Sequence, residues 1–129
     1  MPTPRAFLRG CVYLVEFHPP NQPGVTLQKY FVCLQEGRLF ERATEFVGVR
    51  ITSLKENEAR RKYPTHVFLS PEESNTDYGA KVICEWIHTL PKQDVIDYAY
   101  TLSDATMREI NERLLIALGM VSLEDIEQE

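Results

Sequence analysis

Two residues near the start of this chain could take part in phosphate chemistry. Lys29 lies between a proline-glycine loop and the apolar run YFVCLQ at residues 30–35, and a lysine supplies a positive charge that attracts phosphate oxygens. His18 follows the apolar run CVYLVEF, and histidine ordinarily titrates near neutrality, so it could donate or accept a proton. Each also has a simpler interpretation: a solvated lysine where a strand begins, and a hydrogen-bonded or solvated histidine.

Two further candidates lie in the run VGVRIT at residues 47–52, which alternates like a strand. Alternation sends Arg50 and Thr52 to the same face of that strand. A guanidinium can hold two phosphate oxygens at once, and a threonine hydroxyl can donate a hydrogen bond to another. The simpler interpretations are a plain surface arginine and a threonine that caps a turn.

The histidines, acids and cysteines form no pattern typical of a metal site. No pair of histidines has metal-ligand spacing, and the adjacent acids Glu72 and Glu73 lie in a segment of turn composition. Three cysteines lie inside apolar runs without a CxxC pair: Cys11, Cys33 and Cys84. We therefore predict no metal, no cofactor and no disulfide, and we expect buried thiols in the cytoplasm.

The elements that must position these residues are mostly strands. Strands are predicted at residues 11–17, 30–35, 47–52, 65–70 and 80–87, with a charged loop or short helix at 53–64. A helix follows Ser103, a good N-cap, and ends at Gly119, with Met107, Ile110, Leu114 and Leu118 as its apolar stripe. We predict an antiparallel barrel-like sheet with a C-terminal helix packed on it, in one domain of residues 1–129 with a core of about 9–120 and an acidic tail at 121–129.

The net charge of −5 hides a difference between the two halves of the chain. Residues 1–66 carry ten Lys/Arg and six Asp/Glu, a net +4, whereas residues 67–129 carry four and thirteen, a net −9. The basic half could offer a local phosphate-binding face despite the acidic total. No run has the length of a membrane span or the layout of a signal peptide, so we expect no membrane partner.

Five segments occur in an order typical of one known family: RGCVYLVEFHP at residues 9–19, ITS at 51–53, PTHV at 64–67, CEWIHTL at 84–90 and LSDATMREINERLLIALGM at 102–120. With these segments the chain resembles the MazF/PemK family of plasmid-maintenance toxins, which inhibit cell growth. The resemblance implies a dimeric SH3-like barrel that cleaves single-stranded RNA without a metal. It also implies a cognate antitoxin whose disordered C-terminal tail blocks the substrate groove.

The resemblance also implies roles for individual residues. Lys29 falls on the position of the family's catalytic arginine, and Thr52 on its catalytic threonine. His18 is our third candidate for catalysis, and for RNA binding we add Arg50, Ser53 and Gln28. Arg50 could return the guanidinium that position 29 has lost.

The chain departs from the family pattern at several of these places. Gln22-Pro23-Gly24-Val25 stands where the family has Gly-Ser-Glu-Gln, so the loop carboxylate is absent, and Tyr30 replaces the proline after the catalytic arginine. Trp86 and His88 stand where the family usually has glutamine and arginine. The alternative function is therefore a catalytically silent dimeric module that binds nucleic acid or protein as a regulator.

Overall fold

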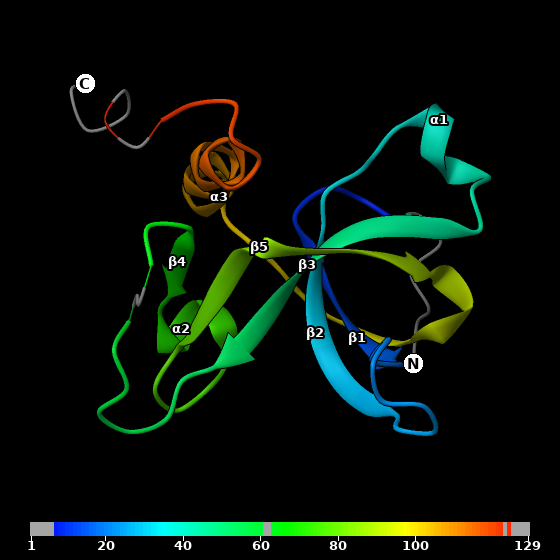
Figure 1. Ribbon diagram of the computed structural model, residues 1–129, viewed down its shortest axis with the longest axis horizontal. Coiled ribbons are helices and arrows are strands. Elements are labelled where there is room, and N and C mark those ends of the chain that lie inside the picture. Colours follow the sequence, from blue (N-terminus) through cyan, green and yellow to red (C-terminus); the bar gives the residue numbers. More distant parts are fainter. Residues whose placement is uncertain (1–6, 61–62, 123, 125–129) are drawn as a thin grey trace. The chain divides into compact units, whose positions relative to one another are not determined.

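The computed structural model describes residues 7–60, 63–122 and 124. These residues form six strands and three α-helices, with one 3-10 helix between the last two strands (Figure 1). The strands are β1 (Cys11–Phe17), β2 (Leu27–Cys33), β3 (Glu45–Ser53), β4 (His66–Leu69), β5 (Ala80–Pro91) and β6 (Val95–Thr101). The helices are α1 (Arg38–Glu41), α2 (Pro71–Ser74), η1 (Lys92–Asp94) and α3 (Asp104–Ala117).

The strands follow the order β4-β5-β3-β2-β1-β6 in one antiparallel sheet, and its two end strands are not joined by hydrogen bonds in the described part of the chain. The prediction of a mainly β fold with a C-terminal helix is confirmed. The prediction of about five strands is wrong by one, because β6 lies in the stretch VIDYAYT that we had assigned to no element. The side chains of β6 are partly buried or exposed, so its apolar signal is weak.

The chain divides into two compact units. Unit 1 comprises the described residues up to Arg50 together with Ile87–Thr101, and unit 2 comprises Ile51–Trp86 and the described residues from Leu102 onward. Among the described residues, no helix is both long and apolar enough to cross a lipid bilayer.

Unit 1 is organised by β1, which pairs with β2 on one side and with β6 on the other. The two faces of β1 differ, because side chains alternate between the faces of a strand. One face carries an aromatic-rich core, in which the Tyr13 ring stands edge-on to Phe46 and the Phe17 ring is tilted against Phe31. The buried members of this core are Cys11, Tyr13, Val15, Phe17, Phe31, Cys33, Phe46 and Leu90.

Unit 2 contains the β4-β5 hairpin, and α3 packs against β4. The Ser103 hydroxyl accepts a hydrogen bond from the backbone N–H of Thr106, which confirms the predicted N-cap. Glu73 of α2 accepts from the Ser103 backbone N–H and from the Thr106 hydroxyl, both at 2.9 Å, and so ties α2 to the start of α3. Of the predicted apolar stripe, Ile110 and Leu114 are buried, whereas Leu118 is 58% exposed.

Two element boundaries differ from the prediction in ways that affect the site. β2 begins at Leu27, so Lys29 lies inside the strand instead of at its entrance. β5 continues to Pro91, so His88 is also within a strand. The cysteines are buried and unbridged, as predicted.

Candidate nucleic-acid interface

Lys29 lies on the same side of β2 as the aromatic core of unit 1. It is paired with Val15 of β1, and residues directly opposite in an antiparallel pair project to the same face. Phe31, two residues further along β2, shares that face and is fully buried. Lys29 itself is half-buried, so part of its side chain lies beside these apolar residues and part is in solvent.

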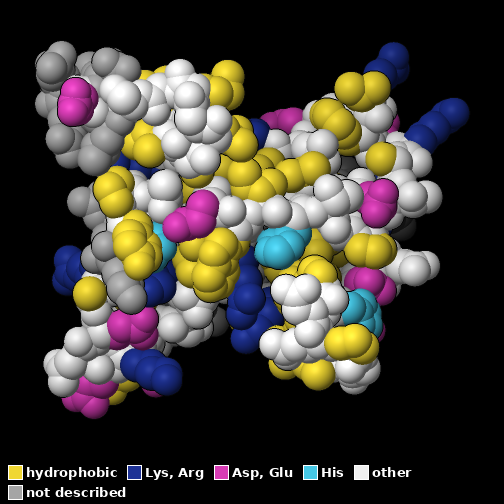
Figure 2. Space-filling view, in the orientation of Figure 1, with side chains coloured by type: hydrophobic (Ala, Val, Ile, Leu, Met, Phe, Trp, Pro, Cys, Tyr) yellow, Lys and Arg dark blue, Asp and Glu magenta, His cyan; other side chains and the backbone are white. Residues whose placement is uncertain are grey.

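Arg50 and His88 lie against aromatic side chains of this core. The Arg50 guanidinium carbon lies 5.9 Å from the centre of the Phe17 ring, within the range of a cation–π contact. The His88 ring stands edge-on to Phe17 at 5.1 Å and to Phe31 at 5.6 Å. Histidine side chains visible in Figure 2 likewise lie beside hydrophobic ones.

Burial changes the charge behaviour of both residues. Burial, and next the positive charge of Arg50, lower the pKa of His88 below its usual value of 6.5. Burial also lowers the pKa of Arg50, which stays a cation at neutral pH because an arginine starts at 12.5. At neutral pH this surface therefore offers a permanent cation beside an uncharged imidazole that can accept a proton.

His18 lies at the rim of a pocket that it shares with His88. The pocket has a volume of about 240 Å³ and is lined by Glu16, Phe17, His18, Pro20, His88, Thr89, Leu90, Pro91 and Asp94. His18 Nδ1 is 3.4 Å from the Thr26 hydroxyl, and its Nε2 is 3.9 Å from Asp94 Oδ2. The structure therefore brings His18 together with two acids and a second histidine.

The other predicted site residues are placed differently. Gln28 is paired with Glu16, so β2 presents Gln28 and Lys29 to opposite faces. Thr52 and Ser53 end β3 in unit 2, where Thr52 is half-buried and Ser53 is exposed. Arg50 and Thr52 are both in β3 with one residue between them, as the predicted alternation requires.

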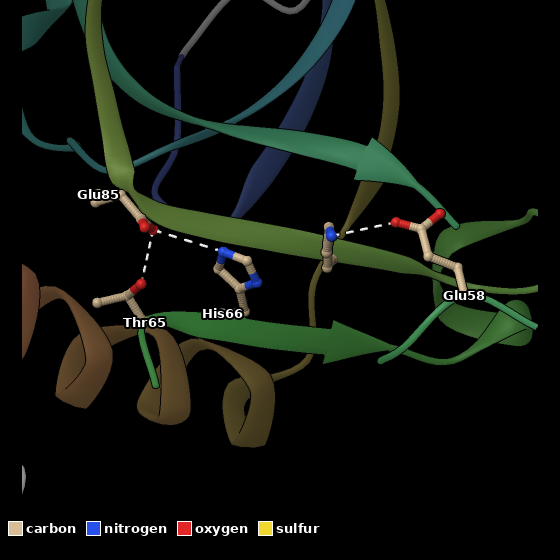
Figure 3. Close-up of polar contacts among 5 residues, drawn as sticks. Glu58, Thr65, His66 and Glu85 are labelled. Atoms are coloured by element: carbon tan, nitrogen blue, oxygen red, sulfur yellow. Dashed lines mark hydrogen bonds and ion pairs between the residues drawn. The ribbon is translucent and has the colours of Figure 1, made fainter. Parts of the chain in front are cut away.

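Unit 2 holds a second histidine–carboxylate pair, drawn in Figure 3. His66 Nε2 lies 3.8 Å from Glu85 Oε1, and the same oxygen accepts a 2.7 Å hydrogen bond from the Thr65 hydroxyl. His66 is 4% exposed, and the Tyr63 ring packs edge-on against it. Its burial is typical of a structural histidine.

Sequence reasoning gave no role in the site to His88, Glu16 or Asp94. For His88 a signal existed, because it stands where the resembled family usually carries arginine. For Glu16 and Asp94 no local signal existed, because they are distant in sequence and meet only through the pairing of β1 with β6.

Comparison with known proteins identifies a family and several relatives. Residues 8–118 match the model of the PemK-like, MazF-like toxins of type II toxin-antitoxin systems. A curated relative, "Endoribonuclease MazF1" from Mycobacterium bovis, is 37% identical over 76 residues, which cover 59% of this chain and 65% of the relative. The chain thus spans less than two thirds of that relative's length.

Solved structures extend the comparison. An endoribonuclease in complex with its cognate antitoxin, from a mycobacterial species, has a TM-score of 0.68 at 29% identity and covers 88% of this chain and 96% of its own. A MazE-MazF structure from Deinococcus radiodurans has a TM-score of 0.67 at 18% identity, over 88% of this chain and 96% of its own. At that identity the second likeness concerns the fold alone.

Proposed function

Because the chain belongs to the PemK-like, MazF-like toxins of type II toxin-antitoxin systems, we propose that it is a toxin that cleaves single-stranded RNA without a metal ion and thereby inhibits translation and growth. The names of its relatives support this, since two of them are endoribonucleases. The observation in this molecule that supports the proposal is that Arg50 and His88 lie against Phe17, and His88 also against Phe31, the residue two places from Lys29 on the same face of β2.

Metal-free RNA cleavage needs three kinds of group. The ribose 2′-OH attacks the neighbouring phosphorus, so a base must take its proton, a donor must protonate the leaving 5′-oxygen, and positive charge must stabilise the phosphorane. In our proposal Arg50 and Lys29 supply the positive charge. The planar Arg50 guanidinium can bind two phosphate oxygens at once, and the Lys29 ammonium is a compact single charge. His88, uncharged at neutral pH, is the candidate base, with His18 at the same pocket as a second proton-transfer group.

The remaining predicted residues have smaller roles in this scheme. The family resemblance keeps Thr52 as a hydroxyl donor to a phosphate oxygen and Ser53 as an RNA contact, both at the end of β3. Gln28 projects from the opposite face of β2 to Lys29, so we leave it outside the reacting group. The aromatic rings offer stacking surfaces for unpaired bases, which suits a single-stranded substrate.

We propose two protein partners. An antitoxin with a disordered C-terminal tail would cover the basic surface and exclude RNA, and a relative of known structure is in complex with its cognate antitoxin. A second copy of the chain would form a homodimer. Trp86 is 43% exposed. A tryptophan that a second protomer covers would be exposed in this way in a single protomer.

We also propose that the chain acts in the cytoplasm, because its three buried free thiols suit a reducing compartment.

One alternative keeps a specific observation in its favour. The loop at residues 22–25 lacks the family's carboxylate, and Lys29 replaces its arginine, so a silent module that binds RNA or protein remains the competing function. A single assay distinguishes the two functions. Purified chain is incubated with a long single-stranded RNA in EDTA, and the ends are mapped.

We expect discrete cuts by the unmodified chain and loss of cutting in Lys29→Ala and Thr52→Ala. Uncut RNA with the unmodified chain would favour the silent module. Undiminished cutting in Lys29→Ala would remove that lysine from the mechanism while leaving the enzyme intact.

A further inference from the structure

Unit 1 contains a group of side chains suited to binding a metal ion, outside the cationic surface described above. One ring nitrogen of His18 and carboxylate oxygens of Glu16 and Asp94 all lie within 4.8 Å of one another. We propose that this cluster binds a divalent transition-metal ion, for which Zn²⁺ is the probe. The cluster shares His18 with the proposed RNA cleavage, which itself needs no metal and which we expect to proceed in a chelator.

The pairing of β1 with β6 brings the two acids together. Val15 is paired with Val95 at the end of this ladder, and the next residue outward on each segment is Glu16 of β1 and Asp94, the last residue of η1. Two like charges this close to each other repel. A dication shared by Glu16 and Asp94 would replace this repulsion with attraction, which is a physical reason for the pair to bind a metal.

The histidine is oriented from its other side. Its Nδ1 lies 3.4 Å from the Thr26 hydroxyl, whereas its Nε2 faces Asp94 Oδ2 at 3.9 Å. Metal-binding histidines characteristically use one ring nitrogen for the metal and the other in a hydrogen bond that fixes the ring. His18 has this arrangement, with Thr26 as the orienting partner.

The 3.9 Å separation also fits an ion between the ligands. It is longer than a normal hydrogen bond. Zinc held at about 2.0–2.1 Å by each of two tetrahedral ligands separates them by roughly 3.4 Å, so a small movement of His18 toward Asp94 is needed. The His18 side chain is 56% exposed, which leaves it free to make that closure.

The donor set selects the class of metal. One imidazole and two carboxylates suit zinc and its first-row neighbours, whereas magnesium and calcium prefer oxygen ligands alone. Three protein ligands leave a fourth position open for water. The pocket beside the cluster, which His88 also lines, provides room for that water.

Isothermal titration of chelator-treated, dialysed protein with ZnCl₂ tests the proposal. We expect one saturable Zn²⁺ site per chain, a melting temperature that rises with Zn²⁺, and no comparable binding of MgCl₂. Glu16→Gln and Asp94→Asn keep the side-chain shape and should each weaken binding at least about tenfold, and loss of the orienting hydroxyl in Thr26→Val should weaken it about tenfold. Circular dichroism of each variant checks that it remains folded.

Glu85→Gln is the matched control, because Glu85 forms a histidine–carboxylate pair of nearly the same length, 3.8 Å, with His66. This variant should bind Zn²⁺ like the unmodified chain. Absence of saturable Zn²⁺ binding, equal binding of Mg²⁺, or an equal loss in Glu85→Gln would each overturn the proposal. RNA cleavage in EDTA tests the proposed function separately, so the two can fail independently.

Discussion

Each unit of the molecule contains a histidine beside a carboxylate, and the two pairs have almost the same length but different surroundings. His18 Nε2 is 3.9 Å from Asp94 in unit 1, and His66 Nε2 is 3.8 Å from Glu85 in unit 2. The His18 side chain is 56% exposed, whereas that of His66 is 5% exposed. The first lies at the rim of a pocket, and the second is packed under an aromatic ring.

The surroundings of a histidine, more than its distance to an acid, therefore decide whether its role is structural or chemical. A buried histidine that contacts Tyr63 and Glu85 is held as part of the fold, and its replacement disturbs packing. An exposed histidine with two acids and a pocket is accessible to protons, ions and substrate. The pair in unit 1 is therefore open to chemistry, whereas the pair in unit 2 has a structural role.

The largest expected effect is on RNA cleavage by Arg50→Ala. Removing a group that stabilises charge in the transition state typically lowers the rate by about 10²–10³-fold. The matched variant Arg108→Ala removes an exposed arginine from α3 in unit 2 and should cleave at the unmodified rate. Single-turnover cleavage of a labelled RNA measures both, and equal rates for the two variants would contradict the assignment of chemistry to unit 1.

The next effect is on stability and compares two glycines with positive φ. Gly79 in unit 2 has φ +87°, and an added Cβ would lie 2.5 Å from the Leu69 carbonyl oxygen and 2.8 Å from the Phe68 ring. Gly24 in unit 1 has φ +79°, with nothing within 4 Å. Gly79→Ala should lower the free energy of unfolding by about 3 kcal/mol or more, and Gly24→Ala by about 1 kcal/mol.

Urea denaturation of the two glycine variants provides the measurement. Equal midpoints would show that the backbone around Gly79 relaxes to accept the methyl group, so that only the shared φ penalty remains.

A third comparison sets His66→Ala against His18→Ala. Loss of the buried ring should lower the free energy of unfolding by about 2 kcal/mol, because it leaves a cavity and removes a partner of Glu85. Loss of the exposed His18 ring should change it by less than about 0.5 kcal/mol. Thermal and urea unfolding give both values, and a larger loss for His18 would reverse the roles we assign to the two histidines.

The smallest effect is a pH dependence that arises from His88. Its pKa is lowered in the folded chain by burial and by Arg50, so the unfolded chain binds more protons below the ordinary value of 6.5. Stability should therefore fall as the pH drops from 6.5 through the lowered folded pKa. The fall should be smaller in His88→Phe, which keeps an aromatic ring against Phe17 and Phe31.

Removing the neighbouring charge sharpens this prediction. In Arg50→Ala the pKa of His88 should rise, because one of its two causes of depression is gone. An NMR titration of the ring protons follows this directly. An unchanged pKa would mean that burial alone sets the protonation of His88.

Much of the fold could be predicted from local patterns. Alternation identified β1 with its observed bounds, and the N-cap at Ser103 and the glycine at 119 located α3, since these signals depend only on nearby residues. β6 was missed because its side chains are only partly buried or exposed, so it lacks the apolar signal that marks an interior strand.

The site was less predictable, because it depends on pairing between distant segments. Lys29 was found through the family resemblance, but the face it shares with Phe31 depends on the register of β1 with β2. The aromatic contacts of His88 depend on β5 continuing beyond its predicted end at residue 87. Glu16 lies in β1 and Asp94 at the end of η1, directly before β6, and neither η1 nor β6 was predicted.

The proposed metal-free cleavage is tested most directly by the chemistry of the RNA ends. A short single-stranded RNA that contains one mapped cleavage position is incubated with the chain in EDTA, beside the same RNA with a 2′-deoxy sugar at that position. We expect a 2′,3′-cyclic phosphate on the first RNA and no cut in the second, because the 2′-OH is the nucleophile. Cleavage of the deoxy substrate, or cleavage only when a metal is added, would contradict it.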